Sequence, residues 1–216
     1  MVLFRPLQAV IWDMDGVLVD SLPTHVEAWQ IILTRYGYQY TYEQMIPVFG
    51  MNDVSVLSTL TNGRFTEEEQ KTLAREKESI YQDLIGREIK SLPGVSTWLE
   101  NFRDGGLKQT LASSSTRESI SIILKNLHID SFFDIVVSGE GFPSKPNPFI
   151  FLKAAEKLNI QPENLLVIED SAVGVEAAKT AGMYCLAVTT TTTKEELKKA
   201  DLVVNRLNQL TIPLLE

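Results

Sequence analysis

The stretch Ala9-Val-Ile-Trp-Asp13-Met-Asp15-Gly16 decides how the rest of the chain is interpreted. Residues 9–12 form a continuous apolar run that ends abruptly at an acidic residue. Apolar runs without polar alternation are typical of strands covered on both faces, as in a parallel sheet. Similar runs occur at 111–112, 135–137, 165–168, 184–188 and, more weakly, 202–204.

Amphipathic helices are predicted between several of these runs. Apolar residues recur at i, i+3, i+4 and i+7 starting from Val95, from Ile120 and from Phe151, which is the spacing of one helix face. Strands that alternate with helices imply right-handed crossovers and an open, doubly wound sheet. The predicted fold is therefore α/β, with a Rossmann-like parallel sheet.

Three helix starts are suggested by local residue pairs. Ser115 with Glu118, and Thr193 with Glu196, have the spacing of a capping box, in which the first side chain accepts a hydrogen bond from the helix backbone. Residues 147–148, Asn-Pro, are typical of an N-cap followed by proline in the first helical turn.

Residues 21–91 break the alternation, because they carry helical signals and no convincing strand. The charge-rich stretch 67–77 is expected to be a solvated helix face. One apolar helix face is predicted from Val26, Trp29, Leu33 and Tyr36. We expect residues 21–91 to form a helical cap domain inserted after the first strand, and residues 1–20 and 92–216 to form the core.

Composition and charge narrow the function classes. The 216 residues carry a formal charge of −8 and no basic run, so a nucleic-acid partner is not expected. No apolar run reaches the length of a bilayer span, and the N-terminal stretch does not resemble a signal peptide. The single cysteine, Cys185, cannot form an internal disulfide and fits the reducing cytoplasm. A monomer or a weak dimer is expected.

Polar residues follow the predicted strands, and in a parallel sheet the strand ends meet at one edge. They are Asp13 and Asp15 after the first run, Ser113 and Ser114 after the second, Lys145 beyond the third, and Glu169 and Asp170 after the fourth. Converging carboxylates repel one another unless a cation lies among them, and hard oxygen ligands favour Mg²⁺. A serine and a lysine can bind phosphate oxygens, and a carboxylate can attack phosphorus. The pattern therefore predicts phosphoryl transfer at a magnesium site.

Four motifs in order resemble those of the haloacid dehalogenase superfamily. The stretch 13–21, Asp-Met-Asp-Gly-Val-Leu-Val-Asp-Ser, resembles the first motif, and Ser113, the stretch 145–148 and the stretch 169–174 resemble the other three. The resemblance covers nearly the whole chain. A helical insertion after the first motif points to the branch that includes β-phosphoglucomutase and many sugar-phosphate phosphatases.

The resemblance implies roles for the acidic residues. Asp13 would be the nucleophile, and Asp15 would protonate the leaving oxygen and then activate water. Mg²⁺ would be held by the Asp13 carboxylate, the Asp15 backbone carbonyl and Asp170, with Glu169 as a further candidate ligand.

The resemblance also implies the substrate-binding residues. Ser113 and Lys145 would bind the transferring phosphoryl group, while Ser115 would cap the next helix. Ser114 and Gly16 are also expected to contact the substrate. His25 resembles a histidine by which the mutases couple hinge movement to acid–base chemistry, and the alternative is an ordinary, partly exposed helix histidine.

The same site can transfer the phosphoryl group to water or to a sugar hydroxyl. In the β-phosphoglucomutase pattern, an arginine that grips a distal phosphate lies in the motif matched by residues 50–53, where this chain has Asn52 and Asp53. An acid there would repel a second phosphate, so a phosphatase acting on a small phosphorylated metabolite is favoured. A sugar phosphomutase is the alternative. A phosphorylated signalling module is a third interpretation, but such a module would not need the helical insertion.

Overall fold

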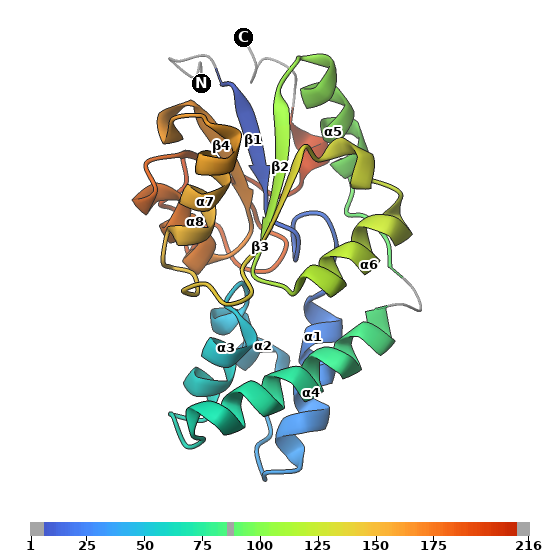
Figure 1. Cartoon of the computed structure of the whole chain (residues 1–216), viewed down its shortest axis with the longest axis vertical. Coiled ribbons are helices and arrows are strands. Elements are labelled where there is room, and N and C mark those ends of the chain that lie inside the picture. Colours follow the sequence, from blue (N-terminus) through green and yellow to red (C-terminus); the bar gives the residue numbers. More distant parts are fainter. Residues whose placement is uncertain (1–6, 86–88, 211–216) are drawn as a thin grey trace.

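The computed structural model describes residues 7–85 and 89–210. Its centre is a six-stranded parallel sheet with the strand order β3-β2-β1-β4-β5-β6 (Figure 1). The strands are β1 (Ala9–Trp12), β2 (Lys108–Ser113), β3 (Ile135–Ser138), β4 (Leu165–Glu169), β5 (Tyr184–Val188) and β6 (Leu202–Val204). The predicted α/β fold with a Rossmann-like parallel sheet is confirmed.

The apolar character of β1 follows from helices on both faces of the sheet. Val10 and Trp12 pack in one buried cluster with α5 (Val95–Asp104) and α6 (Arg117–Leu127). Ala9 and Ile11 point the other way, into a second cluster with α7 (Phe149–Leu158) and α8 (Ala172–Thr180). Because side chains alternate across a strand, a strand buried on both faces must be apolar at every position.

The helices α1 (Leu22–Thr34), α2 (Tyr42–Met45), α3 (Asp53–Leu60) and α4 (Glu67–Ile85) lie between β1 and α5 in the sequence. Figure 1 shows them together beyond the end of the sheet toward which β1 runs. A third buried apolar cluster is built only from residues between Leu22 and Leu73. We interpret this group of helices as the cap, and the division at 21–91 stays a prediction.

Short 3₁₀ helices complete the described chain, at Ile46–Val48, Asp130–Phe132, Pro162–Asn164 and Leu207–Gln209. Within residues 7–85 and 89–210, no helix combines the length and the apolar character that a bilayer crossing requires.

Two predicted helix starts are wrong in detail. The N-cap of α6 is Thr116, whose Oγ1 accepts a hydrogen bond from the Ser119 backbone N–H, because the Ser115 hydroxyl donates to Asp15 instead. Thr193 accepts from the Glu196 N–H, but residues 194–199 form turns and not a helix. The backbone N–H of Asp201 already pairs with the Cys185 carbonyl beside β5, so this short stretch has no room to continue as a helix.

A third helix start shifts by one residue. Helix α7 begins at Phe149 with Pro148 at the N-cap position, and the Asn147 side chain accepts from the Phe149 N–H. The capping hydrogen bond expected of Asn147 is therefore present.

The cap departs from the predictions at two positions. Tyr36 lies beyond the end of α1 and is exposed, so it does not share the buried face of Val26 and Trp29. Lys77, expected on a solvated face, is 0% exposed. Its ammonium group has buried partners, which are described below.

Candidate active site

The candidate site lies where the strand order reverses. From β1 the sheet extends through β2 in one direction and through β4 in the other, and ligands of open α/β sheets bind beyond the strand ends at such a point. Asp13 directly follows β1, Ser113 is the last residue of β2, and Glu169 is the last residue of β4. The topology therefore brings together residues that are far apart in the sequence.

Three carboxylates gather at these strand ends. Oxygen atoms of Asp13, Glu169 and Asp170 lie within 4.8 Å of one another, and all three residues are buried. The Nζ atom of Lys145 lies 2.6 Å from Asp13 Oδ1 and 2.6 Å from Glu169 Oε1. One buried ammonium group therefore faces three buried carboxylates.

The electrostatics show a shortage of positive charge in this cluster. Burial raises the pKa of Asp13 to about 8, although Lys145 opposes the shift. Burial, together with the charges of Glu169 and Asp13, also raises the pKa of Asp170 well above its ordinary value. For Lys145, burial would lower the pKa, but the two carboxylates outweigh it and raise the pKa. A hard oxygen donor set with unbalanced negative charge fits a divalent cation such as Mg²⁺.

Glu169 is held more firmly than the other two carboxylates. Its Oε2 accepts from the backbone N–H groups of Asp170 and Ser171, at 2.8 and 2.9 Å, and from the Ser171 hydroxyl at 3.0 Å. Its Oε1 accepts from Lys145. Asp13 and Asp170 have fewer partners, so they are the better placed to bind a cation.

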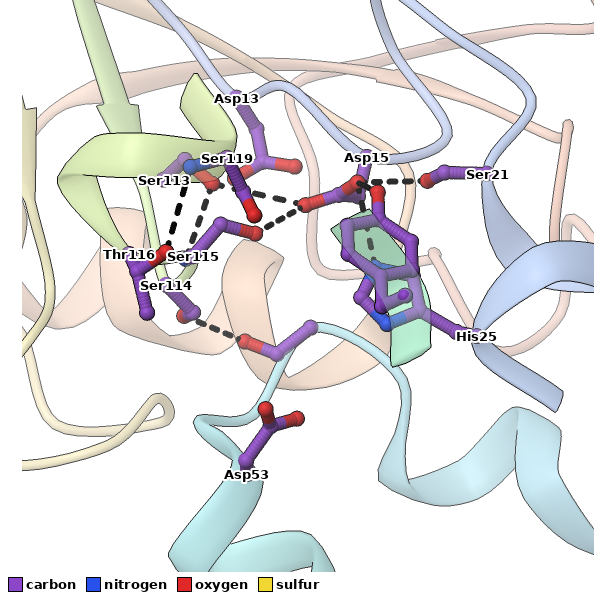
Figure 2. A network of polar contacts seen from close by, with 12 residues as sticks. Asp13, Asp15, Ser21, His25, Asp53, Ser113, Ser114, Ser115, Thr116 and Ser119 are labelled. Carbon is purple, nitrogen blue, oxygen red and sulfur yellow. Dashed lines mark hydrogen bonds and ion pairs between the residues drawn. The ribbon is translucent and has the colours of Figure 1, made fainter. Parts of the chain in front are cut away.

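Asp15 has a different environment from Asp13, although only one residue separates them. Its Oδ1 accepts from the Ser21 hydroxyl at 2.5 Å, and its Oδ2 accepts from the Ser115 hydroxyl at 2.8 Å (Figure 2). Burial would raise the pKa of Asp15, but hydrogen bonds from His25, Ser21 and Ser115 outweigh it and hold this pKa well below its usual range. Asp15 is therefore a carboxylate in this state.

His25 lies against Asp15 and belongs to the site. Its Nε2 is 3.4 Å from Asp15 Oδ1, and its ring stacks on Tyr81 with centroids 3.9 Å apart. The Tyr81 hydroxyl also donates to Asp15 Oδ1, at 3.3 Å. Because the Lys77 ammonium donates to Nδ1 at 2.8 Å, the ring hydrogen must lie on Nε2, facing Asp15. His25 is a partly exposed residue of helix α1, with 14% of its side chain exposed, so its predicted part in the chemistry of the site stays a prediction.

Sequence reasoning missed two residues of this network, both on α4. Lys77 joins His25 to Asp53, whose Oδ1 lies 2.9 Å from the ammonium group. Tyr81 is fully buried between His25 and Asp15. Lys77 is the last residue of the charge-rich stretch 67–77 and Tyr81 follows one turn later, both far along the sequence from His25.

A cavity of about 970 Å³ lies between the cap and the core. Of the residues expected to form the site, Asp13, Asp15, His25 and Ser114 line it. Cap residues that line it include Trp29, Phe49, Asp53 and Glu78. The side chains of Asp13 and Asp15 therefore face a space of the size in which proteins bind small molecules.

Hydrogen bonds tie the cap to the core at the rim of this cavity. The Ser114 hydroxyl donates to the Gly50 carbonyl at 2.7 Å (Figure 2). The Asn52 backbone N–H donates to Ser144 Oγ at 2.9 Å, and its side-chain amide donates to the Phe142 carbonyl at 3.2 Å. Ser114 thus contacts the cap here, and its predicted contact with substrate stays a prediction.

Ser113 and Gly16 lie behind the cavity surface. Ser113 Oγ accepts from the Ser115 N–H at 3.1 Å and lies 3.5 Å from Asp15 Oδ2. Gly16 has a φ of +80° and packs so closely on Asp170 that a Cβ would lie 1.9 Å from Asp170 Oδ2. The predicted substrate contacts of both residues stay predictions.

We expect Gly16→Ala to reduce kcat/KM by about 100-fold or more, because the new methyl group must displace the Asp170 carboxylate. Gly37→Ala is the matched control, since Gly37 has the same φ of +80° but no atom within 4 Å of a Cβ. In both variants, the left-handed backbone lowers the free energy of unfolding by about 1–2 kcal/mol. Steady-state kinetics and thermal melting of the two variants separate the displacement of the Asp170 carboxylate, which only Gly16→Ala causes, from the backbone strain that both variants share. Equal activities would contradict the expectation.

Comparison with known proteins gives consistent matches over most of the chain. The sequence model of the family described as haloacid dehalogenase-like hydrolase matches residues 10–188. A "Phosphorylated carbohydrates phosphatase" of Thermotoga maritima is 34% identical over 182 residues, 82% of each chain. A "Beta-phosphoglucomutase" of Bacillus subtilis is 33% identical and covers 97% of this chain and 94% of its own length. The crystal structure of a β-phosphoglucomutase from Clostridium difficile superposes with a TM-score of 0.86 at 31% identity, covering 95% of this chain and 94% of that one.

Proposed function

This chain belongs to the haloacid dehalogenase-like hydrolase family, and from that premise we propose that it is a phosphatase that hydrolyses a small phosphate monoester, such as a sugar phosphate, through an aspartyl-phosphate. The observation that carries the proposal is the pairing of Asp13 with Asp15 beside the cavity. The Asp13 carboxylate lies in a cluster that carries more negative than positive charge, and the Asp15 carboxylate is surrounded by hydrogen-bond donors.

The fit of the acidic cluster to a hard divalent cation supports Mg²⁺ as the cofactor. The carboxylates of Asp13 and Asp170 and the backbone carbonyl of Asp15 would hold it, with Glu169 as a further candidate ligand. When bound, Mg²⁺ neutralises charge on the phosphoryl oxygens and on the cluster.

In the first step, an Asp13 carboxylate oxygen forms a bond to phosphorus while the bond from phosphorus to the ester oxygen breaks. Asp15 donates a proton to the leaving oxygen. This requires Asp15 to be protonated when substrate is bound, and the negative charge of the bound phosphate raises its pKa in that direction. Lys145, 2.6 Å from Asp13 Oδ1, is placed to hold a phosphoryl oxygen as charge develops there.

In the second step, Asp15 removes a proton from water, and the water oxygen attacks phosphorus. The bond between Asp13 and phosphorus breaks, which releases inorganic phosphate, restores the Asp13 carboxylate and leaves Asp15 protonated, the form that the first step requires. The hydrogen bonds from Ser21 and Ser115 stabilise Asp15 as a carboxylate, the form that accepts a proton.

A sugar phosphomutase of the β-phosphoglucomutase type is the second candidate. It is favoured by the match to the Bacillus subtilis enzyme over 97% of this chain. A phosphatase is preferred because Asp53 and Glu78 place two carboxylates on the cap side of the cavity beside the buried ammonium of Lys77, whereas Lys71 and Arg75, which also line the cavity, are exposed. That wall disfavours the second phosphate that a mutase must hold.

The formal charge of −8 supports a metabolite as partner, with no nucleic-acid or membrane partner. We place the enzyme in the cytoplasm, because a single buried cysteine suits a reducing compartment. A monomer or weak dimer stays the expected assembly.

The test is phosphate release from hexose, pentose, nucleotide and glycerol phosphates, with Mg²⁺ and with EDTA. We expect selective release with Mg²⁺, and a loss of about 100-fold or more with EDTA that excess Mg²⁺ restores. Conversion of β-glucose 1-phosphate to glucose 6-phosphate, primed by a bisphosphate, would instead establish the mutase. Phosphate release that EDTA leaves unchanged would contradict the assignment of the metal.

A further inference from the structure

Asp53 occupies a fixed position on the cap side of the cavity. It is the first residue of α3, and Figure 2 shows its side chain on the opposite side of the polar network from Asp13. The preceding residue, Asn52, caps α3 through the Ser55 N–H and is bound to the core loop by its hydrogen bonds to Ser144 and Phe142. The Asp53 carboxylate is therefore held in place from both the cap and the core.

Lys77 neutralises only one side of this carboxylate. The Lys77 ammonium has Asp53 Oδ1 at 2.9 Å, His25 Nδ1 at 2.8 Å and Glu78 Oε2 at 3.8 Å as neighbours. Two of its three N–H groups are used by Asp53 and His25, and the third lies beside Glu78 in an ion pair that is too long for a hydrogen bond. Lys77 is 0% exposed and is not among the residues that line the cavity, so it is not placed to donate to a ligand there.

The second oxygen of Asp53 is open. No hydrogen bond among residues 7–85 and 89–210 reaches Asp53 Oδ2, while the residue lines the cavity and its side chain is 22% exposed. Glu78 lines the same wall, and its Oε1 already accepts from the hydroxyls of Thr116 and Ser119. Burial and the Glu78 charge raise the pKa of Asp53, and Lys77 opposes the shift.

An open, acceptor-only oxygen selects a hydrogen-bond donor. A sugar hydroxyl supplies a neutral donor, whereas a phosphate dianion supplies only acceptors and a like charge. Lys71, Arg75 and Arg117 also line the cavity, but all three are exposed, so they do not change the character of this inner wall. The wall therefore matches the hydroxyl-bearing part of a carbohydrate.

We propose that Asp53 is a specificity-determining residue whose Oδ2 accepts a hydrogen bond from one hydroxyl of the sugar or polyol part of the substrate. The inference rests on the proposed phosphatase function and names the part of the substrate that this wall selects. Asp53 takes no part in the transfer of the phosphoryl group. It affects the rate by placing the ester over Asp13.

The experiment pairs a protein variant with substrate analogues. Wild type and Asp53→Asn are assayed on the hexose monophosphate that wild type hydrolyses fastest, on its monodeoxy analogues, and on p-nitrophenyl phosphate, which has no hydroxyl. We expect one deoxy analogue to lose about 10- to 100-fold in kcat/KM with wild type, the range for a hydrogen bond to a charged group. On the parent sugar phosphate, the kcat/KM of Asp53→Asn should be lower than that of wild type by a similar factor. On the sensitive deoxy analogue, Asp53→Asn and wild type should have the same kcat/KM. Its activity on p-nitrophenyl phosphate should stay within about threefold.

Asp83→Asn is the matched control, because Asp83 is an exposed carboxylate on α4 that does not line the cavity. Equal losses by Asp53→Asn on all esters would show a structural role and overturn the inference. If wild type hydrolyses every monodeoxy analogue as efficiently as the parent sugar phosphate, the inference is overturned. This result needs no variant, so it holds even if Asp53→Asn fails to fold. Hydrolysis of p-nitrophenyl phosphate but of no sugar phosphate would also overturn it while leaving the phosphatase intact. No phosphate release from any ester would overturn both proposals.

Discussion

Asp13→Asn is expected to lower kcat for phosphate release by about 10⁴-fold or more while the protein stays folded. The amide has nearly the shape of the carboxylate but cannot form the aspartyl-phosphate. Burial already raises the pKa of Asp13 to about 8. A neutral side chain at this position therefore removes unfavourable negative charge from the cluster, and we expect no loss of thermal stability without metal.

The measurement is steady-state phosphate release together with thermal melting in EDTA. Asp104→Asn is the control, because Asp104 is a largely exposed carboxylate at the end of α5. Mass spectrometry of acid-quenched wild type should also detect a phosphoryl group on Asp13 that Asp13→Asn lacks. Turnover by Asp13→Asn within about tenfold of wild type would remove Asp13 from the role of nucleophile.

Asp15→Asn is expected to lower kcat/KM by about 10²- to 10⁴-fold on a sugar phosphate, the usual range for removing a general acid–base group. The loss should be smaller on p-nitrophenyl phosphate, because nitrophenolate leaves without a proton. The second step still needs a base to activate water. Asp15→Asn should therefore release a burst of p-nitrophenolate and then stall as phosphorylated enzyme.

Rapid-mixing absorbance traces and a leaving-group series test this expectation. The single oxygen of the Asn side chain can accept from one of the Ser21 and Ser115 hydroxyls, and its amide group can donate to the other, so the network around position 15 can keep both contacts. Ser21→Ala is a useful companion variant, since it removes one of these contacts but keeps the acid. A loss of the same size for good and poor leaving groups would show that Asp15 does not protonate the leaving oxygen.

The sheet and the position of the acidic residues at its strand ends could be predicted because both depend on short stretches of sequence. Strand β1 is apolar at each position, since Ala9 and Ile11 pack on one face and Val10 and Trp12 on the other. The first polar residue after such a strand lies at the carboxyl end of the strand, which is where Asp13 is found. Parallel pairing then brings the ends of β2 and β4 beside it.

Lys77 could not be placed in the same way, because the charge-rich stretch around it suggested solvent. Its burial depends on the packing of α4 against α1, which brings it to His25. A signal was present in the spacing, since Lys77 falls in the apolar row formed by Leu73, Tyr81 and Ile85, each four residues from the next. A lysine within such a row indicates a buried ion pair.

The helix start predicted at Ser115 is wrong because of a contact that local spacing does not describe. The Ser115 side chain lies against Asp15 across the site, and its hydroxyl donates to that carboxylate, a strong hydrogen bond because the acceptor is charged. The next residue, Thr116, accepts from the Ser119 N–H and caps the helix. The Thr193 pattern has a different cause, since the Asp201 N–H pairs with the Cys185 carbonyl beside β5.

The third apolar cluster, which is confined to residues between Leu22 and Leu73, gives this protein a degree of modularity. Substitutions in this cluster draw on a different set of packed side chains from those that stabilise β1 and β4. Effects at distant, independent sites combine additively. Cap mutations away from the contacts that link Asp53, Lys77 and His25 to Asp15 can therefore accumulate while the sheet that carries Asp13 is inherited unchanged.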